Sequence, residues 1–71
     1  MKTGRVDGFD EHVGLGTVRA DDGGTYPFHC TAIADGSRTI AVGARVVFAV
    51  QPGPGGRWEA GGITPIAGDA S

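Results

Sequence analysis

Short apolar runs alternate with glycines and polar residues along the chain, and this pattern predicts a protein built from β-strands. Five runs alternate apolar and polar positions with the two-residue period of a half-buried strand. They span residues 2–10, 14–20, 25–29, 45–51 and 57–65. No stretch of ten residues keeps a helical apolar period without an interrupting glycine or proline. The pattern therefore indicates an all-β chain with three strands, a long connection and two further strands.

Glycine, proline and aspartate mark the connections between these runs. Residues 21–24, Asp-Asp-Gly-Gly, form a strong hairpin signal because both residue types tolerate the positive φ of tight turns. Residues 30–33 are expected to form a short helical turn, and residues 52–56, Pro-Gly-Pro-Gly-Gly, a loop. Five short antiparallel strands leave exposed edges unless the sheet closes, so a small barrel is expected. The expected domain is 1–66, followed by a flexible tail at 67–71.

Length and charge narrow the classes of function. A chain of 71 residues corresponds to one domain. Six Lys and Arg stand against eight Asp and Glu, which gives a net charge of −2. This balance argues against a broad polycationic surface and against strong salt-driven binding to phosphates. It leaves room for binding by base stacking, which depends on aromatic faces more than on charge.

Several kinds of chemistry lack the residues that they need. Cys30 is the sole cysteine, so an intrachain disulfide cannot form, and with His12 and His29 it makes too small a set for a zinc site. No catalytic triad or carboxylate dyad can be assembled, so the protein is expected not to be an enzyme and to need no cofactor or metal. No apolar segment approaches a membrane span or a signal peptide, so a cytoplasmic protein is expected.

Four segments in order resemble the motifs of the bacterial cold-shock domain family. Residues 4–10, Gly-Arg-Val-Asp-Gly-Phe-Asp, resemble Gly-x-Val-Lys-Trp-Phe-Asn, and residues 13–18, Val-Gly-Leu-Gly-Thr-Val, resemble Lys-Gly-Phe-Gly-Phe-Ile. Residues 26–33, Tyr-Pro-Phe-His-Cys-Thr-Ala-Ile, resemble Val-Phe-Val-His-Phe-Ser-Ala-Ile, and residues 43–48 resemble Gly-Gln-x-Val-x-Phe. The similarity runs from Gly4 to Pro65. It implies an all-β, small five-stranded antiparallel OB-fold barrel.

The family's strand parity agrees with the alternation of large apolar residues in this chain. The inward positions are expected to be Val6, Gly16, Val18, Tyr26, Phe28, Val46, Phe48 and Val50, with Ile33 and Ile63 completing the core. Tyr26 and Phe28 replace smaller residues of the family. Gly8 and Gly16 are expected to make room for them.

The outward face of the first three strands departs from the family. Cold-shock proteins stack single-stranded bases on aromatic residues there, and each stacked base contributes about 1–3 kcal/mol. The matching positions hold Gly8 for Trp, Pro27 for Phe, and Leu15, Thr17 and Cys30 for Phe. Asp7 and Val13 stand where the family has lysines, and only Phe9 and His29 remain. Loss of even three of these stacking residues would cost roughly 3–9 kcal/mol of binding energy if their contributions add.

Some of the remaining candidates allow two interpretations. Phe9 either stacks on a base or covers the mouth of the barrel as part of the core. Trp58 either supplies a replacement platform, with Arg57 contacting phosphate, or packs across the barrel end against Pro52 or Pro54. Seven residues are therefore the candidate nucleic-acid-binding set: Phe9, Leu15, Thr17, Arg19, His29, Arg57 and Trp58.

Two hypotheses of function follow. The first is a cold-shock-like protein that binds single-stranded RNA or DNA weakly and with little sequence specificity. The alternative is a degenerate cold-shock barrel that acts as a protein-interaction or dimerisation module. Val47 and Ala49 motivate the alternative, because they form a small outward apolar strip on the fourth strand.

Overall fold

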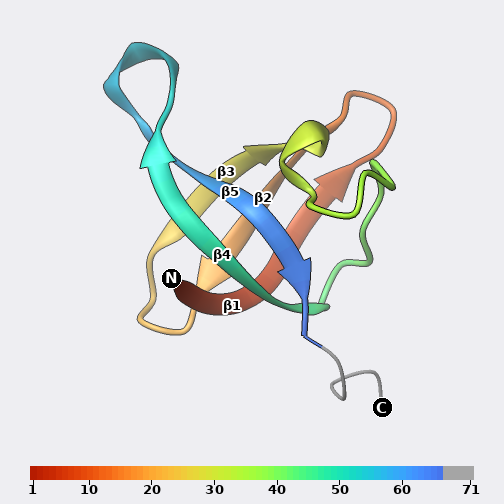
Figure 1. Cartoon of the computed structure of the whole chain (residues 1–71), viewed down its shortest axis with the longest axis horizontal. Coiled ribbons are helices and arrows are strands. Elements are labelled where there is room, and N and C mark those ends of the chain that lie inside the picture. The colour runs from red at the N-terminus through yellow and green to blue at the C-terminus, as the bar shows by residue number, and fades with distance from the viewer. Residues whose placement is uncertain (67–71) are drawn as a thin grey trace.

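The computed structural model describes residues 1–66, and these form five strands with two short 3₁₀ turns (Figure 1). The strands are β1 (Lys2–Asp10), β2 (Leu15–Ala20), β3 (Thr25–His29), β4 (Arg45–Pro52) and β5 (Trp58–Pro65). The turns are η1 (Cys30–Ala32) and η2 (Pro54–Gly56). The strand count, the strand order and the short turn after β3 confirm the expectations from sequence. The tail expected at residues 67–71 lies outside the described residues.

Three strand boundaries differ from the expected ones by a single residue each. Gly14 has a φ of 79°, which is a left-handed and not an extended conformation, so β2 begins at Leu15. Pro52 is the last residue of β4 and lies opposite Trp58, which begins β5. The loop expected at residues 52–56 therefore lies one residue further along the chain, at residues 53–57, and part of it is the turn η2.

All pairs in the sheet are antiparallel, and the strand order is β3-β2-β1-β4-β5. The two outer strands, β3 and β5, contact each other. Next to them Ile33 and Ile63 form an isolated parallel bridge, and the Ala34 N–H donates to the Ile63 carbonyl over 2.8 Å. Contact between the outer strands closes the sheet into a barrel of the OB type and leaves no long open edge.

The inward residues fill the barrel as the alternation predicts. Nine residues form the buried core: Val6, Val18, Ala20, Phe28, Ile33, Val46, Phe48, Ala60 and Ile63. Gly16, Tyr26 and Val50, also expected to face inward, are half-buried. Burial of large side chains such as Phe28 and Phe48 contributes about 1.5–3 kcal/mol each. The core is thus small. It includes Ala20 and Ala60, which were not among the inward positions expected from the sequence.

The two glycines expected to accommodate the aromatic core residues do different things. A Cβ on Gly16 would lie 2.7 Å from Cζ of Phe28, so the absence of a side chain at Gly16 is what admits the Phe28 ring. A Cβ on Gly8 would meet only Oγ1 of Thr17, at 3.7 Å. The expectation for Gly16 is confirmed, whereas that for Gly8 is wrong, because Gly8 faces Thr17 and not the core.

Two aspartates of the β2–β3 turn attach this hairpin to β1 and β4. Oδ2 of Asp21 accepts a hydrogen bond from the Thr3 hydroxyl over 2.6 Å, and Oδ1 accepts one from Nη1 of Arg45 over 2.9 Å. The Thr3 hydrogen bond, followed by that of Arg45, lowers the pKa of Asp21. Asp22 forms an ion pair with Lys2 and accepts from the Gly24 N–H, and these contacts lower the pKa of Asp22.

The lowered pKa values predict that the protein loses stability in acid. A carboxylate whose pKa is lower in the folded state stabilises the protein fully above its unfolded pKa of about 3.9, and loses this effect as the pH falls through the folded pKa. We therefore expect the Tm to fall on acidification below about pH 4. Circular dichroism melts from pH 6 to pH 2.5 measure it. The variant D21N/D22N should have a lower Tm than the wild type at pH 6, and its Tm should fall less steeply as the pH is lowered. An equal dependence of the Tm on pH in both proteins would contradict the role assigned to these two aspartates.

Candidate nucleic-acid interface

The outward face of β1, β2 and β3 has β2 at its centre. Leu15, Thr17 and Arg19 alternate along this strand with inward residues, and all three belong to the candidate set. Leu15 lies between Asp10 of β1 and His29 of β3, and Thr17 lies between Gly8 and Pro27. The antiparallel pairing therefore brings together residues from three separate motifs of the sequence.

A wide, solvent-open hollow lies on this face, and we call it the glycine hollow. It has a volume of about 520 Å³ and is lined by Gly8, Phe9, Asp10, Leu15, Gly16, Thr17, Pro27 and Phe28. Gly8 and Gly16 contribute no side chains, so little stands between solvent and the aromatic residues beneath. Phe28 is only 2% exposed and Phe9 is half-buried, which places their rings at the base of the hollow.

Phe9 points inward because β1 contains a bulge. The register of β1 on β2 shifts between Val6 and Gly8, so that Gly8 lies opposite Thr17 and Phe9 lies opposite the inward Gly16. The Phe9 ring stacks on Phe28, with ring centroids 5.8 Å apart and planes 2° from parallel. One face of Phe9 is thus covered by the core. The packing on Phe28 supports the core interpretation, and the remaining surface of Phe9 lines the glycine hollow, where base stacking stays a prediction.

His29 lies at the rim of the face and also ends β3. Its Nδ1 accepts the Thr31 backbone N–H over 3.4 Å and lies 3.1 Å from the Thr31 hydroxyl, so the imidazole caps η1. A neutral ring that accepts at Nδ1 carries its proton at Nε2. His29 is exposed. It therefore offers Nε2–H as a donor near Leu15, in addition to its structural role.

The loop between β1 and β2 is held by Asp10. Its Oδ1 accepts the backbone N–H groups of His12 and Val13, over 3.0 and 3.3 Å. This Asx-type turn sets the position of Val13, which is 58% exposed, and of Leu15, which is 49% exposed. The exposed lining of the glycine hollow here consists of the apolar Leu15 side chain beside the Asp10 carboxylate, and neither is aromatic.

The structure does not bring every candidate residue to this hollow. Arg57 and Trp58 lie in the β4–β5 hairpin, which projects from the barrel in Figure 1, and neither lines the glycine hollow. Trp58 is 59% exposed and lies opposite Pro52 in the sheet register, so its indole is both accessible to a ligand and beside one of the prolines expected to pack against it. Arg19 lies on the same face as the glycine hollow, two residues beyond Thr17.

The apolar strip on β4 is narrow. Val47 and Ala49 are both half-buried. Val47 has Thr3 of β1 on one side and Thr64 of β5 on the other, and Ala49 lies opposite Gly61. The strip is therefore bordered by threonines and glycine, and the role in dimerisation or partner binding stays a prediction.

Comparison with known proteins places the chain in a family. It is 33% identical to the cold shock-like protein CspD of Vibrio cholerae serotype O1, over 100% of this chain and 95% of that protein. It is 43% identical to the cold shock-like protein CspA of Shewanella violacea, over 76% of this chain and 80% of that protein. The chain belongs to the cold-shock protein family. No protein-family model matches it.

A solved structure supports the same cold-shock fold. Drosophila Unr CSD456 superposes with a TM-score of 0.77 and 25% sequence identity over 99% of this chain. The present chain spans 28% of the length of that one. A cold-shock domain with an intact barrel thus carries an outward face from which most of the family's aromatic side chains are missing.

Sequence reasoning missed part of the hollow. Gly8 and Pro27 were identified as lost platforms, not as lining residues, and Asp10, Gly16 and Phe28 were not considered for the site. The family position of Gly8 and Pro27 was the available signal, because a residue that replaces a stacking side chain still lines the same surface. Within residues 1–66 no group of three metal-ligating side chains comes together, and both helical turns are three residues long, too short to cross a membrane.

Proposed function

We propose that this cold-shock protein binds single-stranded RNA or DNA through the glycine hollow, weakly and with little sequence specificity. The family is one of nucleic-acid-binding proteins, and the carrying observation is the open hollow on β1–β3 with Phe9 and Phe28 at its base. A base that enters the hollow would contact phenyl rings and the apolar rim formed by Leu15 and Pro27. The occupant would thus be held by its flat apolar surface, a property common to every base.

The same geometry accounts for the low affinity that we expect for single-stranded nucleic acid. None of the five outward positions that hold aromatics in the family holds one here, and stacking contributes about 1–3 kcal/mol per base. The net charge of −2 adds little attraction to phosphates. The Thr17 hydroxyl and the Asp10 carboxylate in the hollow, with the His29 Nε2–H nearby, are the polar side-chain groups that could read a base edge, which is too few for strong sequence preference. We expect a dissociation constant of about 0.1–1 mM.

Trp58 and Arg57 are proposed as an outlying contact. An exposed indole stacks on any base, and a neighbouring guanidinium can bind a phosphate. Because the hairpin lies apart from the glycine hollow, a strand must be long enough to reach both places. A heptanucleotide should therefore quench Trp58 fluorescence, whereas a dinucleotide should occupy the hollow alone.

An NMR titration with a uridine or thymidine heptanucleotide tests the proposed function. In about 20 mM salt we expect amide shifts at Gly8, at residues 15–17 and at Phe28, with Thr64 of β5 as the unaffected reference. No shift in β1–β3 at millimolar oligonucleotide would exclude binding at this face. Shifts at Val47 and Ala49 that depend on protein concentration alone would instead favour self-association through β4.

A further inference from the structure

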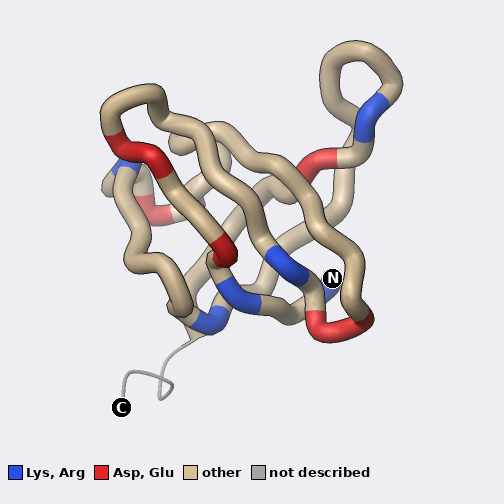
Figure 2. Tube along the Cα trace, turned by 180° about the vertical axis from the view of Figure 1, so that it is seen from behind, with Lys and Arg blue, Asp and Glu red and all other residues tan. Residues whose placement is uncertain are grey.

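Three arginines form a row across the sheet. In the register of the strands, Arg5 of β1 lies opposite Arg19 of β2 on one side and opposite Arg45 of β4 on the other. Figure 2 shows the basic segments of these three strands side by side. Directly opposite residues have Cβ atoms only about 4.5–5.5 Å apart, and like charges at such positions are destabilising. Negative charge beside the row is therefore favourable.

Contacts within the protein supply partners for only some of these three guanidinium groups. Arg45 donates to Oδ1 of Asp21 over 2.9 Å. Arg5 donates to the carbonyl oxygen of Gly43 over 3.0 Å and interacts electrostatically with the Asp21 carboxylate. Within residues 1–66, the Arg19 guanidinium has no hydrogen bond or ion pair, and Arg19 is exposed.

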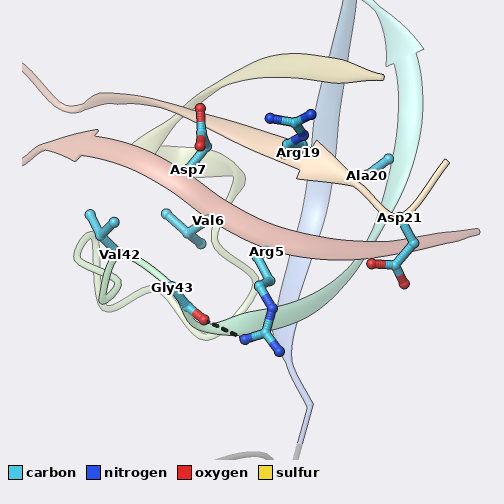
Figure 3. A pocket seen from close by; sticks show the side chains of 8 residues that line it. All are labelled: Arg5, Val6, Asp7, Arg19, Ala20, Asp21, Val42 and Gly43. Atoms are coloured by element: carbon cyan, nitrogen blue, oxygen red, sulfur yellow. Dashed lines mark hydrogen bonds between the residues drawn. The ribbon is translucent and has the colours of Figure 1, made fainter. Parts of the chain in front are cut away.

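A second hollow of about 440 Å³ lies at this row, and we call it the arginine hollow (Figure 3). Arg5, Asp7 and Arg19 line it together with Asp21 and the turn at Val42 and Gly43. In Figure 3 the Arg5 side chain is directed to the Gly43 carbonyl, and the Arg19 and Asp7 side chains extend to the opposite side. Asp21 is already engaged by Thr3 and Arg45, so Asp7 is the carboxylate that opposes an incoming anion.

The two hollows adjoin along β1 and β2. Asp7 lines the arginine hollow and its neighbour Gly8 lines the glycine hollow. Arg19 is two residues from Thr17 on the same face of β2, a separation of about 6.8 Å in an extended strand. A ligand that presents a flat apolar group to one hollow can therefore present an anion to the other.

We propose that the arginine hollow binds a phosphate group, with Arg19 as its principal ligand and Arg5 as supporting charge. A guanidinium presents a planar fork of N–H donors that matches two phosphate oxygens. The source of this phosphate rests on the proposed function. It is the backbone of the nucleic-acid strand whose base occupies the glycine hollow. Free phosphate offers the same chemistry, and the two sources are separated below.

Asp7 limits the strength of this site. It lies in the arginine hollow and faces the same anion as Arg19, so its carboxylate weakens the attraction that the arginines provide. The variant D7N removes the opposing charge at nearly constant size. It should tighten phosphate binding by about threefold to tenfold, the range of a single exposed charge contact.

The experiment compares the wild type with R19Q and with a control, R38Q, that removes an equal charge from the exposed connection between β3 and β4. Inorganic phosphate is titrated against chloride at matched ionic strength while the arginine Nε–Hε NMR signals and the Tm are recorded. We expect the Arg19 and Arg5 signals to shift, and phosphate to raise the Tm by about 2–5 °C more in the wild type than in R19Q. Phosphate also stabilises proteins by exclusion from their surfaces, but that effect is common to all three proteins.

The same variants are then titrated with the heptanucleotide at several salt concentrations. R19Q should bind about threefold to tenfold more weakly and lose about 0.7 from the slope of log K against log salt, the value for one phosphate contact of a single strand. Phosphate binding at Arg19 without oligonucleotide binding would support the anion site while the proposed function fails. Oligonucleotide binding with an unchanged slope in R19Q, or Arg19 signals that phosphate does not shift, would overturn the site.

Discussion

Replacing Leu15 and Thr17 by phenylalanine is expected to raise the affinity for a single-stranded heptanucleotide by about thirtyfold to twenty-thousandfold. Both positions hold Phe in the cold-shock motif that residues 13–18 resemble, and both face outward on the central strand of the proposed interface. Each aromatic platform contributes about 1–3 kcal/mol, and two platforms would contribute about 2–6 kcal/mol. Gly8 leaves open space beside Thr17, so the new rings can lie flat over the hollow. Fluorescence anisotropy with a labelled oligonucleotide measures the change.

The matched control for this double variant is T64F. Thr64 is an exposed residue of β5, and it lies opposite Val47, away from the glycine hollow. An aromatic residue there adds one exposed phenyl ring without extending the proposed site. Equal gains in T64F and in L15F/T17F would show that any exposed ring attracts the oligonucleotide. A folded L15F/T17F protein with unchanged affinity would remove the β1–β3 face from consideration.

Gly4→Ala is expected to lower the free energy of unfolding by about 3 kcal/mol, and the Tm by roughly 10–20 °C. Gly4 is buried where β1 crosses β2, and a Cβ would lie 2.3 Å from the carbonyl oxygen of Arg19 and 2.9 Å from Cα of Ala20. Both are backbone atoms, so no side-chain rotation can relieve the overlap. The strands must separate, and their pairing must weaken. Urea unfolding followed by circular dichroism measures the loss.

Gly8→Ala is the control on the same strand. Its Cβ would meet nothing closer than Oγ1 of Thr17 at 3.7 Å, and the backbone at Gly8 does not have a positive φ. This variant should retain the stability of the wild type within about 0.5 kcal/mol, or gain slightly because the unfolded chain loses freedom. If both alanines cost the same, the close approach of β1 and β2 at Gly4 is not what requires glycine. Should G4A fail to fold at all, its insolubility beside a soluble G8A gives the same ranking.

The alternation of apolar residues was enough to predict most of the core, because strand parity is a local property. Val46 and Phe48 face inward as their two-residue spacing indicates. The position of Phe9 was not decided by that rule. The bulge between Val6 and Gly8 adds one residue to β1, and from there on the inward and outward sides of the strand are exchanged relative to simple alternation. Gly8 inside the strand is compatible with a bulge, but a strand glycine can also mark a close backbone approach, so the sequence alone leaves both interpretations of Phe9 open.

The two hollows differ in how far the sequence could predict them. Leu15 and Thr17 occupy family positions, so the glycine hollow was partly predicted by the resemblance. The arginine row depends on register. Arg5, Arg19 and Arg45 are widely separated in the chain, and they become neighbours only because β1 pairs with both β2 and β4. Arg19 was a candidate by charge alone, and Arg5 was not considered, since a single sequence does not specify which strand residues lie opposite each other.

The core of this barrel is packed from the inner side of the sheet, and this affects how new binding properties can evolve. Because Gly16 and Phe28 settle the core from the inner side of the sheet, the outward positions of β2 can change without repacking the interior. Leu15 and Thr17 are therefore suited to randomisation in a selected library, with stability held nearly constant. A few surface substitutions can therefore give this barrel an aromatic face or another specificity. The residues that determine the fold are therefore largely distinct from those that would determine the ligand.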